Sequence, residues 1–163
     1  MMKKIVLTIL AIVATIIVSE AQPLRLGGRL PDIDVDSSAG NELKLIDKAY
    51  ACIIFMHSES QPTLEAIKNF TKLSEPWRET LAVVLLTPEQ DGFEQEVLLS
   101  FTTNDTIMAF DNNFSTFESF NVEHIPFGVI YETRTRRVQW FGSLSQLSTE
   151  DIQKIIKKEK ASK

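Results

Sequence analysis

The sequence predicts a single compact α/β domain, and three patterns carry that prediction. Residues 50–56 and 81–86 are continuous apolar runs, whose length and lack of alternation are typical of strands buried on both faces. Between them, apolar residues recur at helical spacing with charged residues in the gaps. Near the C-terminus, two strand patterns joined by a polar turn precede a helical pattern, which indicates a hairpin and a closing helix.

The elements before the second buried run follow from shorter patterns. Ile33 and Val35 predict a first short strand, a polar cluster over residues 37–41 predicts a turn, and Leu43 and Leu45 begin a second strand. The helix between the two buried runs is predicted from the spacing of Leu64, Ile67, Phe70 and Leu73.

The elements after the second buried run complete the order βαβ, α, ββα. Apolar spacing predicts helices over residues 93–101 and 114–120, with a short strand over residues 107–110. Pro126 ends that region, and residues 127–132 and 137–141 form the two strands of the hairpin. In the last helix Ser148 and Asp151 form the N-terminal cap, and Ile152, Ile155 and Ile156 form the buried stripe.

The first 21 residues have the layout of a secretory signal peptide. Lys3 and Lys4 precede an apolar run from Ile5 to Val18, and small residues flank a cleavage position after Ala21. The run is shorter than the roughly 20 residues that usually span a membrane. We therefore expect a signal peptide over residues 1–21, one domain over residues 22–163, and a periplasmic or secreted protein; a retained membrane anchor is the alternative.

Charge and cysteine content restrict the classes of partner. The chain has 17 basic and 22 acidic residues. Without Lys3, Lys4 and Glu20 the counts become 15 and 21, a net charge near −6, which disfavours nucleic acid. We expect no membrane partner after cleavage of the signal. Cys52 is the single cysteine, so no internal disulfide can form.

Three segments resemble the thioredoxin-like superfamily, in particular periplasmic thiol-disulfide oxidoreductases and peroxiredoxins. Residues 28–33, Gly-Arg-Leu-Pro-Asp-Ile, look like the opening of these proteins. Residues 53–63 are similar to the strand, turn and helix start that carry the Cys-x-x-Cys pair, and residues 121–126 look like the segment that ends in a cis-proline. The resemblance implies a central mixed β-sheet flanked by helices, with an N-terminal β extension.

The same resemblance implies that the redox chemistry has been lost. Ser60 and Thr63 stand at the two cysteine positions, and a hydroxyl can neither form the reactive thiolate nor make an S–S bond. Glu59 replaces the tryptophan before the first cysteine, where its charge would oppose a thiolate. Ile54 corresponds to the buried acid that assists proton transfer. We therefore expect no catalytic residues, and hence a non-catalytic binding or assembly module.

The candidate binding site keeps the surface on which family members hold an extended peptide. The resemblance places Ser60, Gln61, Pro62, Thr63, Ile125 and Pro126 in it, with the Ile125 backbone pairing with the peptide as a strand does. The expected partner is a polypeptide or an envelope protein. In the simpler interpretation, Ser60 to Thr63 only cap and start the helix, and Pro126 only makes a rigid turn.

Alternative functions would depend on the remaining reactive side chains. Residual thiol-disulfide exchange or peroxidase activity through Cys52, or through an unrecognised site, is the alternative function, although a cysteine inside a buried strand is usually inert. His57 and His124, with Glu59 and Ser60, suggest a metal site or a hydrolase, but they lack metal-ligand spacing, so we expect neither metal nor cofactor. The basic turn over residues 133–137 is interpreted as a solvated hairpin tip.

Overall fold

The protein is built around a five-stranded mixed sheet. The computed structural model describes residues 23–36, 42–43, 46–88 and 106–160. Within them the strand order is β3-β2-β1-β4-β5. The strands are β1 (Tyr50–Phe55), β2 (Leu81–Thr87), β3 (Thr106–Phe110), β4 (Phe127–Glu132) and β5 (Arg137–Ser143). β1, β2 and β3 are parallel, whereas β4 is antiparallel to both β1 and β5. The predicted α/β class and mixed sheet are thus confirmed.

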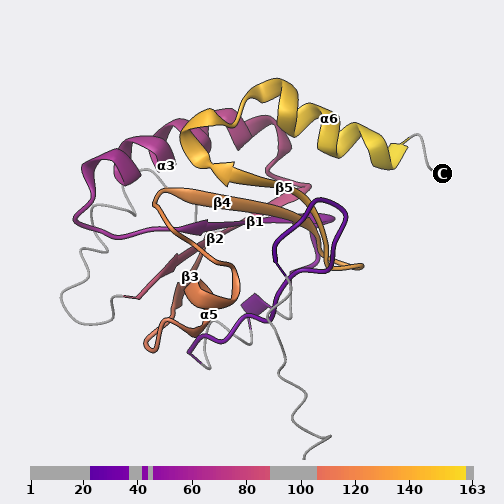
Figure 1. Cartoon of the computed structure of the whole chain (residues 1–163). Helices are drawn as coiled ribbons and strands as arrows, with labels where there is room; N and C mark the ends of the chain where they lie inside the picture. Colours follow the sequence, from indigo (N-terminus) through magenta and orange to yellow (C-terminus); the bar gives the residue numbers. More distant parts are fainter. Residues whose placement is uncertain (1–22, 37–41, 44–45, 89–105, 161–163) are drawn as a thin grey trace, which may run out of the picture.

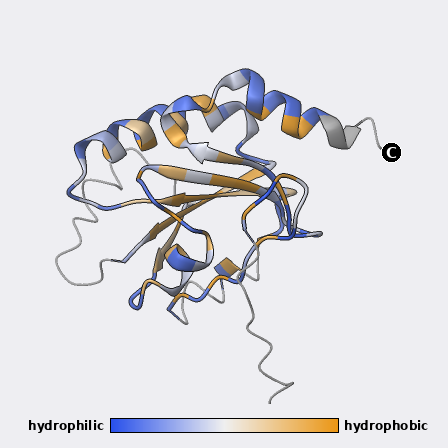
Figure 2. Cartoon of the chain, in the orientation of Figure 1, coloured by the Kyte–Doolittle hydropathy of each residue, from blue (hydrophilic) through white to orange (hydrophobic). Residues whose placement is uncertain are grey.

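The helices form layers on the two faces of the sheet. α3 (Gln61–Ser74) and α6 (Thr149–Lys160) cover one face, whereas α5 (Ser115–Ser119) and the N-terminal segment lie on the other (Figure 1). Short 3-10 turns, η1 (Glu75–Trp77) and η2 (Leu144–Gln146), follow α3 and β5. The strands are mostly apolar, and α3 and α6 turn polar stripes outward (Figure 2).

β1 lies at the centre of the sheet, as its uninterrupted apolar sequence predicts. All six of its residues are buried. Because side chains alternate along a strand, Cys52 and Ile54 enter the core beneath α3 and α6, whereas Ile53 and Phe55 enter the core on the opposite face. Two separate cores therefore stabilise this one strand.

Phe55 is the centre of the second core, and its removal should be costly. Its ring lies 5.0, 5.1 and 6.1 Å, between centroids, from the rings of Phe117, Phe120 and Phe127. We expect Phe55→Ala to lower the free energy of unfolding by about 3–5 kcal/mol, because it leaves a cavity in a packed core. Denaturant unfolding measures this loss. Phe114→Ala, at a half-exposed ring, is the matched control and should cost about 1 kcal/mol or less; equal losses would contradict the described packing.

The closing helix begins with the predicted reciprocal cap. The backbone N–H of Ser148 donates to Asp151 Oδ2 at 3.1 Å, and the backbone N–H of Asp151 donates to Ser148 Oγ at 3.2 Å. Ile152 and Ile155 are buried against the sheet. The hairpin and this helix are therefore confirmed as predicted.

The predicted N-terminal strands are not formed in the described residues. Residues 23–36 form no strand; they meet β5 in an isolated bridge between Arg29 and Arg137, and the Asp36 N–H donates to Phe110 O of β3 at 3.1 Å. The expected strand at Ile33 and Val35 is therefore wrong. Leu43 lies in a helical turn rather than a strand, and Leu45 is outside the described residues.

A side chain of α5 satisfies the backbone of Asp34 in place of a strand partner. The backbone N–H of Asp34 donates to Thr116 Oγ1 at 2.8 Å, and this hydroxyl donates in turn to the Asp34 carbonyl at 2.8 Å. One buried hydroxyl thus satisfies both backbone groups of Asp34. Ile33 and Val35 still pack against the second core, which accounts for their strand-like alternation.

Three sequence-based predictions fall on residues outside the description. These are the signal peptide over residues 1–21, the turn over residues 37–41 and the helix over residues 93–101. Among the helices that the structure does describe, none has the length and apolar character needed to cross a membrane.

Candidate binding site at the carboxyl end of the parallel strands

The candidate site lies where β1, β2 and β3 end. The chain leaves β1 at Phe55, and the Met56 backbone N–H still donates to Leu86 O at 2.9 Å. β4 runs the other way and starts at this edge, because Phe127 pairs with Phe55. The segments that follow Phe55 and precede Phe127 therefore reach the same edge of the sheet. This topology brings the segment that leads to Ser60 and the segment that ends in Pro126 to one end of the molecule.

Ser60 and Thr63 form a hydrogen-bonded hydroxyl pair at the start of α3. Ser60 has the extended backbone of an N-cap, with φ −83° and ψ 103°, and its carbonyl accepts from the Leu64 N–H at 3.0 Å. Its hydroxyl makes no capping bond, but accepts from Thr63 Oγ1 at 2.9 Å. Thr63 is buried, whereas Gln61 and Pro62 are exposed in the first turn. The predicted helix start is confirmed; the expected side-chain cap is replaced by this pair.

The hydroxyl pair cannot carry out thiol-disulfide exchange. Exchange requires a thiolate and a second thiol that resolves the mixed disulfide. The chain has one cysteine, and it lies in β1 rather than at either position. What remains at this helix start is a short polar contact that holds the first turn together.

Ile125 and Pro126 present the other half of the site. The Ile125–Pro126 peptide bond is cis, as the resemblance implies. Pro126 is buried, and its carbonyl accepts from the Leu144 N–H at 3.1 Å. Within the described part of the chain, the backbone N–H and C=O of the half-buried Ile125 make no hydrogen bond. Ile125 therefore offers one unused donor and one unused acceptor beside a fixed proline.

The histidines near the site make local contacts in the described residues. The Glu59 backbone N–H donates to His57 Nδ1 at 3.4 Å, and the exposed His124 ring lies edge-on to Phe127 at 5.8 Å. The described residues contain no group of three or more His, Cys, Asp or Glu side chains that could hold a metal ion.

Asp111 is a buried carboxyl group at the same end of the sheet, and sequence reasoning missed it. It directly follows β3, and its backbone N–H donates to Thr87 O at 2.9 Å. Its Oδ2 accepts from the Phe117 N–H at 2.9 Å, whereas Oδ1 has no partner among the described residues. Burial raises the pKa of Asp111, backbone hydrogen bonds oppose that shift, and the nearby Asp34 carboxylate adds to it.

The raised pKa of Asp111 predicts how stability changes with pH. The native state favours the protonated carboxyl, so its contribution is fully present below the pKa of an unfolded aspartate, about 3.9, and is lost as pH rises through the native pKa. We expect the unfolding free energy of the wild type, relative to Asp111→Asn, to fall with rising pH across that window. Urea unfolding at a series of pH values measures it. A difference that rises with pH would show that the ionised form is the stabilised one.

Cys52 lies away from this edge, inside the core beneath α3 and α6. Its side chain has 0% exposure, and burial raises the pKa of its thiol. Its neighbours across the sheet are Val83 in β2 and Ile130 in β4. The thiolate is the nucleophilic form of cysteine, and this environment disfavours it. The prediction that Cys52 is a buried core residue is confirmed.

Comparison with solved structures identifies the fold as thioredoxin-like. A putative thiol:disulfide interchange protein DsbE from Chlorobium tepidum matches with a TM-score of 0.64 and 15% identity over 83% of this chain and 97% of that one. The thioredoxin domain of a thiol-disulfide oxidoreductase from Bacteroides vulgatus matches with a TM-score of 0.61 and 11% identity, covering 83% and 97%. A yeast mitochondrial 1-Cys peroxiredoxin matches with a TM-score of 0.61 and 11% identity, covering 85% and 78%.

These identities establish the fold and do not extend to activity. No family model matches the sequence, and no curated protein matches it significantly. The chain is thus a thioredoxin-like domain with a single, buried cysteine and no Cys-x-x-Cys pair. That composition is consistent with redox inactivity.

Proposed function

We propose that this thioredoxin-like domain is a non-catalytic binding module of the bacterial envelope, which holds an extended polypeptide at the carboxyl end of its parallel strands. The observation that carries the proposal is the unpaired backbone of Ile125, within the described residues, next to the buried cis-proline. A peptide that adds as a strand needs a free N–H and a free C=O on its host. The Ile125 backbone supplies both.

The residues of the candidate site suit a polypeptide better than a reactive substrate. Gln61 and Pro62 are exposed at the start of α3, where the backbone N–H of Gln61 lacks an intrahelical partner and Pro62 has no N–H. A peptide carbonyl can accept from such a group. In place of a nucleophile, the site holds two hydroxyls that are already bonded to each other at 2.9 Å. Binding without turnover is the chemistry that these groups support.

An enzymatic alternative through Cys52 has less support. Its thiol is fully enclosed in β1, and the segments that reach the candidate site begin after Phe55. A substrate would have to open the central strand to reach the sulfur. We therefore place the function in the surface around Ile125.

Site-directed crosslinking in cells tests the proposal. A photoreactive residue at Gln61 should yield a crosslinked polypeptide, whereas the same residue at the exposed Gln153 on α6 is the matched control and should not. With the captured polypeptide bound, hydrogen exchange at the Ile125 amide should slow by at least about tenfold, because the amide then donates to the added strand. Equal crosslinking at both positions, or unchanged exchange at Ile125, would contradict the proposed site.

A further inference from the structure

Five of the six arginines of the chain gather at the end of the sheet opposite the candidate site. Arg25 and Arg29 lie in the N-terminal segment, and Arg134, Arg136 and Arg137 lie at the turn between β4 and β5. We call these five residues the arginine cluster. Their two segments run side by side (Figure 1), because Arg29 and Arg137 face each other in an antiparallel bridge. Residues 108 positions apart in sequence thus form one cationic surface.

The bridge places two like charges at the shortest cross-strand spacing. The Leu30 N–H donates to Arg136 O at 2.7 Å, and the Val138 N–H donates to Gly28 O at 2.9 Å. These bonds flank the bridge, so Arg29 and Arg137 form a non-hydrogen-bonded pair, in which Cα atoms are about 4.5 Å apart and side chains share a face. Like charges directly opposite each other are destabilising. An anion that bound both guanidinium groups would relieve this repulsion.

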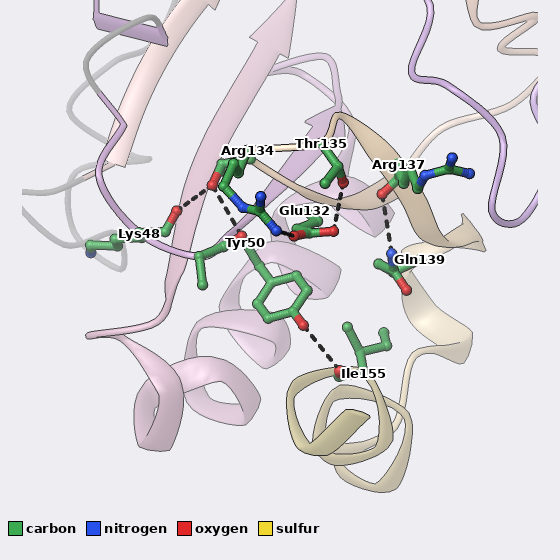
Figure 3. Close-up of polar contacts among 10 residues, drawn as sticks. Lys48, Tyr50, Glu132, Arg134, Thr135, Arg137, Gln139 and Ile155 are labelled. Atoms are coloured by element: carbon green, nitrogen blue, oxygen red, sulfur yellow. Dashed lines mark hydrogen bonds and ion pairs between the residues drawn. The ribbon is translucent and has the colours of Figure 1, made fainter. Parts of the chain in front are cut away.

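Few carboxylates within the described residues neutralise the cluster. Arg134 Nη2 lies 3.6 Å from Glu132 Oε1, whereas Arg137 points away from that pair (Figure 3). The described part of the chain places no carboxylate in an ion pair with the other four arginines. Arg137 Nη1 donates to Gly27 O at 2.9 Å, and Arg136 Nη2 donates to Pro31 O at 3.1 Å. The buried Nε of Arg136 has no partner among the described residues.

The surroundings of the arginine cluster favour an anionic membrane surface as its binding partner. Leu26, next to Arg25, has 65% of its surface exposed, and an apolar side chain beside cations is typical of an interfacial lipid contact. Arg25 also lies only four positions after Ala21, so the cluster is the part of the domain nearest in sequence to the apolar run that ends at Val18. The net charge of the chain is −5, which leaves −10 for residues outside the cluster (−5 minus 5). Those residues would repel an anionic surface and orient the domain.

We infer that the arginine cluster docks the domain on an anionic phospholipid surface. The inference is independent of the proposed function, and it departs from the expectation that the mature chain has no membrane partner. β1 and β4 run from the cluster to the candidate site, since Tyr50 pairs with Glu132 at one end and Phe55 with Phe127 at the other. A docked domain therefore turns Ile125 away from the lipid.

Vesicle partitioning tests the inference on the protein purified from cells that export it. The readout is a ratio: binding to mixed vesicles of phosphatidylglycerol and phosphatidylcholine, divided by binding to vesicles of phosphatidylcholine alone. A ratio is needed because a retained apolar anchor would raise binding to both kinds of vesicle. Each arginine near an anionic surface contributes about a fivefold preference. We expect Arg29→Gln with Arg137→Gln to lower the ratio about 25-fold, and salt of about 1 M, where the Debye length is about 3 Å, to abolish the preference.

The controls separate this site from general charge effects. Lys154→Gln with Lys157→Gln removes the same charge from the exposed side of α6 and should change the ratio less than about twofold. Arg29→Lys with Arg137→Lys keeps the charge and should keep the preference. The inference fails if the protein shows no preference for anionic vesicles, or if the lysine variant loses as much of that preference as the glutamine variant of the cluster. It also fails if millimolar inorganic phosphate at constant ionic strength releases the protein from the vesicles. Binding to immobilised polyglutamate without a vesicle preference would overturn it in favour of an acidic polypeptide.

Discussion

A variant that carries Ser60→Cys and Thr63→Cys will form an intramolecular disulfide under mild oxidation. The two side-chain oxygens already lie 2.9 Å apart, so sulfurs on the same Cβ atoms need only a small adjustment to reach the S–S distance of about 2.05 Å. The helix N-terminus favours the attacking thiolate, whereas Glu59 opposes it. Mass analysis after blocking free thiols should show a loss of about two hydrogens in the folded monomer, in a Cys52→Ala background that excludes mispairing.

A second pair in the same helix is the matched control. Lys68→Cys with Thr71→Cys has the same spacing but lies in the middle of α3, where Cβ atoms three residues apart are about 5–6 Å from each other. A disulfide needs a Cβ separation of about 3.5–4.5 Å, so this pair should stay reduced. If the pair at 60 and 63 also stays reduced while the protein is folded, these residues do not occupy the positions of the family's cysteine pair.

Cys52 should react with a thiol reagent more than about 1,000-fold slower in the native protein than in the unfolded chain. The thiol is inaccessible in the central strand, so modification must await an opening that costs most of the unfolding free energy, about 5 kcal/mol or more for a domain of this kind. Rates of labelling with and without denaturant measure the ratio. Labelling of native protein at the unfolded rate would restore the peroxidase alternative and require an assay for it.

Removing the Cys52 thiol by substitution with alanine tests whether the sulfur takes part in the function. Cys52→Ala should cost roughly 1 kcal/mol, because it removes one small buried group. The variant should also leave binding at the candidate site unchanged, since Cys52 faces the core beneath α3 and α6. A loss of partner capture in a folded Cys52→Ala variant would place the sulfur in the function.

Local chemistry explains which elements the sequence could predict. The buried strands follow from apolar runs, and the closing helix follows from the reciprocal cap of Ser148 and Asp151. The cis-proline followed from the resemblance of residues 121–126 to a known segment rather than from Pro126 alone. In each case the information lies within a few residues of the feature.

The features that the sequence could not predict depend on contacts between distant residues. The strand pattern at Ile33 and Val35 is overridden by Thr116, which is 82 positions from Asp34. In the sequence Asp111 looks like an ordinary turn residue. Only its burial beneath α5 distinguishes it from a solvent-exposed aspartate. The sequence of the basic hairpin turn predicts only a solvated tip, because nothing local shows that Arg29 pairs with Arg137.

The contacts of the N-terminal segment restrict the order in which the protein can fold. The bonds that tie it to the rest of the domain join residues 74 to 111 positions apart, as between Asp36 and Phe110 and between Gly27 and Val138. A chain that emerges from its N-terminus during synthesis presents residues 23–36 first, yet these residues find the described contacts only after β3, α5 and β5 have followed. Contacts of such long range form late. The leading segment therefore stays unpaired until almost the whole domain has been synthesised.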